Sequence, residues 1–107
     1  MTRHSSKLFS APVSGTKVEV SATRVALNGY HMVNLTPALC YIQVFNALAA
    51  NVTVGTTVPY VSIPLPASGG ATLYLGGWNF SALTIACTTD HNNASTADAF
   101  VVLSQAL

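Results

Sequence analysis

Residues 25–89 contain no aspartate, glutamate, lysine or arginine, so most of the chain lacks a formal charge. The whole chain of 107 residues has four basic and three acidic residues. A soluble domain that stands alone normally carries charges of both signs on roughly a quarter or more of its surface. Two explanations are open: partners cover the neutral surface, or serine, threonine, asparagine and glycine hydrate it. The first explanation predicts a subunit of a larger assembly.

Length and hydrophobicity favour one folded domain. The chain is 50% hydrophobic, which excludes disorder for most of its length. Its longest apolar stretch, residues 38–45, is interrupted by Gln43 and is far shorter than the roughly 20 residues of a membrane-spanning helix. The first residues are polar and no long apolar run follows before Lys17, so we expect no signal peptide and synthesis in a cytosol.

The N-terminal residues 1–16 are rich in serine, threonine and lysine and lack a periodic pattern. We therefore predict an arm over 1–16 and a β-sandwich domain over 17–107. All four basic residues lie within the first 24 positions, and they are too few and too scattered for a nucleic-acid groove. Arg3 and Lys7 are candidate contacts to an acidic neighbouring subunit; the alternative is a solvated tail.

Residues 24–33 contain the strongest turn signal of the chain. Asn28-Gly29 separates two apolar runs, a pattern typical of a two-residue β-hairpin. A turn at this point pairs Leu27 with Tyr30 and leaves His31 facing solvent or a subunit interface. The alternative is a loop over this corner that leads into one strand from Tyr30.

Other segments also have the composition or the alternation of strands. They are residues 17–21, 39–45, 58–66, 71–75, 83–87 and 99–105. Three prolines in 58–66 indicate an edge strand, and Gly76-Gly77 is expected to break the strand at 71–75. A helix over 38–50 is the alternative to the strand at 39–45. About eight short strands without a convincing helix predict an all-β fold, a β-sandwich or small jelly roll.

No set of residues in the sequence has catalytic or metal-binding spacing. Asp90-His91 are adjacent but lack a nucleophile motif, and the cysteines and histidines lack zinc spacing. We therefore expect no enzymatic activity, no metal and no cofactor. Cys40 and Cys87 do not form a C-x-x-C motif, and in a cytosolic protein they are expected to be buried free thiols rather than a disulfide.

Trp78, close in sequence to Tyr74 and Phe80, has three possible roles. It could pack in the core, anchor a subunit interface, or stack on a sugar ring from an exposed sheet face. The last role would make the chain a carbohydrate-binding module. Trp78 is therefore a candidate interface residue together with Arg3, Lys7 and His31.

The sequence reads YIQVFNALAANVTVGTTVP over residues 41–59 and IPLPASGG over residues 63–70. These segments resemble small virion structural proteins of tailed bacteriophages, and residues 52–59 are the most specific part. Residues 77–89, a polar loop and the final valine-rich segment are similar too. The resemblance thus extends over roughly residues 39–104.

The resemblance implies a phage particle protein. Together with the size and neutrality of the chain, it leads us to expect a capsid decoration (cement) protein on the outside of the virion head. Such proteins are commonly β-sandwiches, often homotrimers, and bind the major capsid protein and copies of themselves. We expect no nucleic-acid or membrane partner. A neck, tail or fibre accessory protein is the alternative, with a glycan ligand as a minor one.

Overall fold

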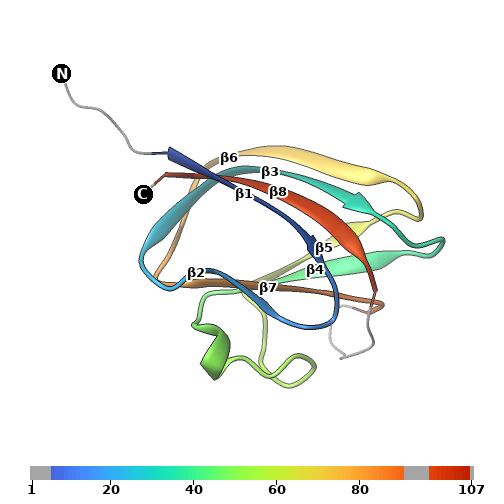
Figure 1. Cartoon of the computed structure of the whole chain (residues 1–107), viewed down its shortest axis with the longest axis horizontal. Helices are drawn as coiled ribbons and strands as arrows, with labels where there is room; N and C mark the ends of the chain where they lie inside the picture. The colour runs from blue at the N-terminus through green and yellow to red at the C-terminus, as the bar shows by residue number, and fades with distance from the viewer. Residues whose placement is uncertain (1–5, 91–96, 107) are drawn as a thin grey trace.

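The computed structural model describes residues 6–90 and 97–106 as two packed antiparallel sheets (Figure 1). The elements are β1 (Ser6–Val13), β2 (Val18–Ser21), β3 (Val25–Asn34), β4 (Cys40–Phe45), the 3-10 turn η1 (Ala49–Asn51), β5 (Val61–Leu65), β6 (Gly70–Phe80), β7 (Leu83–Thr88) and β8 (Ala99–Ala106). Sheet A has the strand order β1-β8-β3-β6, and sheet B has the order β2-β7-β4-β5. The predicted all-β sandwich is confirmed.

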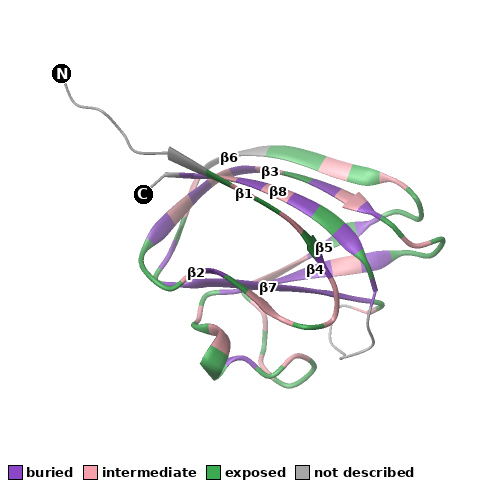
Figure 2. Ribbon diagram, viewed as in Figure 1, coloured by how far each residue is buried: buried purple, intermediate pink, exposed green. Residues whose placement is uncertain are grey.

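The main core fills the space between the two sheets. Strand side chains alternate between the faces of a sheet, so every second residue points inward. Met32 and Val101 of sheet A meet Ile42 and Ile85 of sheet B in one buried cluster, and Figure 2 shows buried residues on the strands of both sheets. Burying each such side chain stabilises the fold by roughly 1.5–3 kcal/mol.

Strand β3 continues through Asn28-Gly29 without a turn, so the predicted hairpin is wrong. It pairs with β8 on one side and with β6 on the other, and its register shifts between Leu27 and Gly29 on both sides. Asn28 is therefore a bulge residue, and Leu27 and Tyr30 lie along one strand instead of opposite each other. The two neighbouring strands supply hydrogen-bond partners that a local turn signal does not reveal.

Strand β6 also runs through the glycine pair that was expected to break it. Gly77 has a φ of +93°, in the region that favours glycine. It lies at the irregular stretch of pairing opposite the β3 bulge, so this glycine permits a bulge and not a strand end. At the start of the strand, a Cβ on Gly70 would lie 2.6 Å from the Met32 carbonyl oxygen, which only glycine allows.

Strand β1 shows that the predicted N-terminal arm is wrong for residues 6–13. This segment pairs with β8 along its full length. Phe9 and Val13 face the core, and the intervening Ser10 and Pro12 are exposed. The polar composition hid this two-residue period. The sandwich domain therefore includes Ser6–Val13, and residues 1–5 of the predicted arm lie outside the described residues.

The remaining strand predictions agree with the structure at the level of elements. The expected strands at 17–21, 39–45, 83–87 and 99–105 correspond to β2, β4, β7 and β8, so a helix over 38–50 is excluded. β5 lies at the edge of sheet B, as its prolines predicted.

Residues 46–60 cover the outer face of sheet B, which the sequence did not reveal. The alternation in residues 83–88 predicted that Leu83, Ile85 and Cys87 face inward and that Thr84, Ala86 and Thr88 face away; all six residues of β7 are buried. Phe45, Val52 and Ala86 form a second, smaller core under the segment, and the Thr84 hydroxyl donates a hydrogen bond of 2.8 Å to the Ala47 carbonyl. Figure 1 shows this segment beneath β2 and β7. Strand β7 of sheet B is thus buried on both faces.

Two of the few charged side chains fasten this covering segment. The Lys17 ammonium donates a hydrogen bond to the Val52 carbonyl. The Glu19 carboxylate accepts a hydrogen bond of 2.9 Å from the Ala49 backbone N–H, at the start of η1. Hydrogen bonds to charged groups are stronger than neutral ones. The charges next to and within β2 therefore stabilise the intrachain cover.

Val52→Ala tests whether the covering segment is part of the cooperative fold. Val52 is 1% exposed, so its truncation should lower the free energy of unfolding by about 1–3 kcal/mol in urea titrations. Val58→Ala is the matched control, because Val58 lies in the same segment but is 87% exposed. Its effect should stay within about 0.5 kcal/mol. Equal effects of the two variants would contradict the second core.

Candidate assembly surface

The outer face of sheet A is a neutral surface that the strand pairing defines. Because Val101 and Leu103 point into the core, the residues between and beside them on β8 point outward. The register of β8 with β1 and β3, and of β3 with β6, places these outward positions in rows that cross the sheet. The rows are Pro12–Phe100–Val33–Gly70, Ser10–Val102–His31–Thr72 and Leu8–Ser104–Gly29. None of these positions is aspartate, glutamate, lysine or arginine.

Several large apolar side chains on this face are open to solvent. Leu8 is 69% and Phe100 is 38% exposed. Pro12 is exposed, and Val33 and Val102 are half-buried. Single exposed hydrophobic residues are ordinary, but a contiguous uncharged set of them is typical of an interaction site. The exposed apolar residues on this uncharged face therefore indicate a contact surface.

His31 lies near the middle of this face and is exposed, so the prediction that it points outward is confirmed. Its Nδ1 lies 2.6 Å from the Thr72 hydroxyl on the neighbouring strand. Of the other predicted interface residues, Lys7 lies in β1 next to Leu8, without a described side chain, and Arg3 lies outside the described residues. Contacts by these two cations stay predictions.

Trp78 does not belong to the outer face. It pairs with the core residue Leu27 across β3 and β6, and it packs against the main core while half-buried. The Tyr60 ring lies 6.1 Å from that of Trp78 and 5.3 Å from that of Phe80, tilted to both. Of the three roles considered for Trp78, packing at the margin of the core has structural support. A flat stacking platform on an exposed sheet face is absent at this residue.

Trp78→Ala should therefore destabilise the fold. We expect a loss of about 2–4 kcal/mol in the free energy of unfolding, since truncation of large aromatic residues leaves a cavity. Tyr60→Ala is the comparison, because Tyr60 is 58% exposed and contacts the same ring. It should cost clearly less in the same thermal or chemical unfolding experiment. A Trp78→Ala variant as stable as the original chain would show that the ring is not part of the core.

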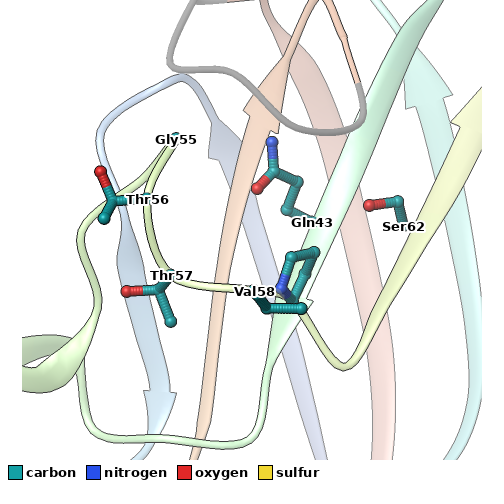
Figure 3. Close-up of a pocket in the computed structure, with 7 residues that line it drawn as sticks. Gln43, Gly55, Thr56, Thr57, Val58 and Ser62 are labelled. Carbon is teal, nitrogen blue, oxygen red and sulfur yellow. The ribbon is translucent and has the colours of Figure 1, made fainter.

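A hollow of about 380 Å³ lies between residues 55–59 and the outer face of sheet B (Figure 3). It is lined by Gln43, Gly55, Thr56, Thr57, Val58, Pro59 and Ser62. The Gln43 amide is buried and donates a hydrogen bond of 2.7 Å to the Thr88 hydroxyl. The lining supplies hydroxyl, amide and apolar groups but no acid or base. Sequence reasoning missed this hollow because the folding of the covering segment creates it.

Cys40 and Cys87 are both fully buried free thiols on the adjacent strands β4 and β7. Their sulfur atoms are 3.6 Å apart. Burial raises the pKa of the Cys40 thiol, and burial followed by the proximity of Cys40 raises that of Cys87. Neutral thiols of this kind act as small hydrophobic groups, as the sequence predicted.

These raised values predict a loss of stability at alkaline pH. The unfolded chain ionises its thiols from about pH 8.5, while the folded chain keeps them neutral. The stabilisation is present below that pH and is lost as the pH rises toward the folded-state pKa values. Under reducing conditions, the free energy of unfolding should fall by about 2 kcal/mol from pH 8 to pH 9.5. The double variant Cys40→Ala/Cys87→Ala should lack this component; an unchanged pH slope would contradict it.

The described part of the chain was also compared with the requirements of a metal site and of a membrane-spanning helix. Within residues 6–90 and 97–106, no group of three or more histidine, cysteine, aspartate or glutamate side chains could hold a metal ion. His91, the neighbour of Asp90, lies outside those ranges. No helix among the described residues is long and apolar enough to cross a membrane.

Comparison with known proteins adds one distant structural likeness. No family model and no curated protein matches the chain. Among solved structures, a chain from the disulfide-linked pili of Bacillus endospore appendages matches with a TM-score of 0.44 and 15% sequence identity. The match covers 99% of this chain and 92% of that one. At this TM-score it assigns no function.

Proposed function

We propose that the chain is a bacteriophage virion structural protein that decorates the outer surface of the head and stabilises the capsid lattice. The observation that carries the proposal is the outer face of sheet A, which is uncharged and exposes Leu8 and Phe100. A neutral apolar surface suits permanent burial in an assembly better than permanent contact with water. The resemblance of residues 39–104 to virion proteins supplies the phage context.

The proposed mechanism is mechanical. A preformed sandwich binds capsid subunits and copies of itself without any chemical step. Contacts of this kind bury roughly 1,200–2,000 Å² each. Many copies then share the load of the packaged DNA across subunit boundaries. Carbohydrate binding through Trp78 is the weaker alternative, because that ring lies at the margin of the core instead of on an open face.

The test is binding of the purified chain to expanded heads assembled without it. We expect saturable binding at many sites per head and a higher temperature of head disruption. Unexpanded heads are the control and should bind less. A folded, monomeric chain without affinity for expanded heads would overturn the proposal. Imaging of the bound particle separates the neck or tail alternative, which predicts density at one vertex only.

A further inference from the structure

The two sheets of the sandwich differ in how far the rest of the chain covers their outer faces. On sheet B, residues 46–60 cover outward positions of β7 so well that Thr84 and Ala86 are each 0% exposed. On sheet A, no other part of the described chain does the same, and Leu8 and Phe100 stay open. The chain thus completes one outer layer by itself and leaves the other incomplete.

We propose that another copy of this chain covers the outer face of sheet A. This inference rests on the proposed role as an assembling subunit and names the surface through which the copies meet. The first argument is charge. The rows of this face carry no formal charge, so a strongly charged partner would gain no complementary contact there. Another copy brings the same neutral groups and no like-charge repulsion.

The second argument is area. Sheet A has four strands, and β1 and β8 are eight residues long. With strands about 4.8 Å apart and about 3.3 Å per residue, the face measures roughly 500 Å² in projection. Side-chain relief and the flanking Leu35, which is 59% exposed, enlarge the accessible area. The face thereby approaches the roughly 800 Å² per partner of a standard stable interface.

The third argument is shape. Gly29 leaves a hollow of about 160 Å³ on this face, lined also by His31, Thr72, Val102 and Ser104 among others. Leu8 projects from β1, at the opposite edge of the sheet from Thr72 on β6. The face therefore presents an apolar projection beside an apolar-walled hollow, and Leu8 stays exposed instead of filling it. A second copy can supply the missing partner to each.

Charge insertion is the first test of this interface. Ser10→Lys and Thr72→Lys together place two like charges at exposed positions of the face. Ala22→Lys with Ala50→Lys adds the same charge at exposed positions away from it. Native mass spectrometry across a concentration series should show an oligomer for the original chain and for the control variant. The face variant should associate at least about tenfold more weakly, since buried like charges oppose contact.

Cross-linking is the second test and does not depend on a loss of binding. Leu8 and Thr72 lie three strand spacings apart, about 14 Å, so cysteines at these positions cannot form a disulfide within one chain. Chains carrying Leu8→Cys and chains carrying Thr72→Cys, mixed under mild oxidation, should form covalent heterodimers. Leu48→Cys replaces Leu8→Cys in the control mixture and should not.

The outcomes separate this inference from the proposed function. A monomeric original chain, or an oligomer unaffected by the face variant and not cross-linked through Leu8 and Thr72, would overturn the inference. If the face variant keeps its oligomeric state but no longer binds heads, the face belongs to the capsid partner: the inference fails and the proposed function stands. If the oligomer forms as expected but has no affinity for heads, the proposed function fails instead.

Discussion

The packing of residues 46–60 onto sheet B is the interaction on which the rest of the structure depends. Phe45, Val52 and Ala86 form a small core outside the main one, and Lys17 and Glu19 hold the segment through its backbone. The central strand β7 of sheet B is therefore buried on both faces. Sheet A has only one buried face. This asymmetry leaves the outer face of sheet A open, with Leu8 and Phe100 exposed.

The distribution of charge follows from the same arrangement. Of the seven charged residues, Lys17 and Glu19 bind the backbone of the covering segment within the chain. Arg24 and Asp98 are exposed beyond the strands that they flank. The uncharged residues 25–89 thus have two structural roles. Some of them fill two cores, and others line the outer face of sheet A.

The sequence predicted which segments form strands better than it predicted which strands and segments pack against them. The local sequence pattern predicted β2, β4, β7 and β8, through alternation or through β-branched and aromatic composition. It failed at Asn28-Gly29, where β6 and β8 impose a continuous strand with a bulge, and at residues 6–13, where polar composition masked a strand. It also missed the cover over β7, because burial of Thr84 depends on Ala47, 37 positions away. Among the candidate interface residues, only His31 lies on the neutral face with its side chain described.

The central claim is that sheet A is an incomplete layer that assembly completes. Hydroxyl-radical footprinting of the chain in its dilute and assembled states tests it most directly, because the reaction reports the exposure of individual side chains. The account predicts that Leu8 and Phe100 lose reactivity on assembly, while Val58, on the covering segment of sheet B, keeps its reactivity. Unchanged labelling of Leu8 and Phe100 in the assembled state, with protection at Val58 instead, would contradict the account.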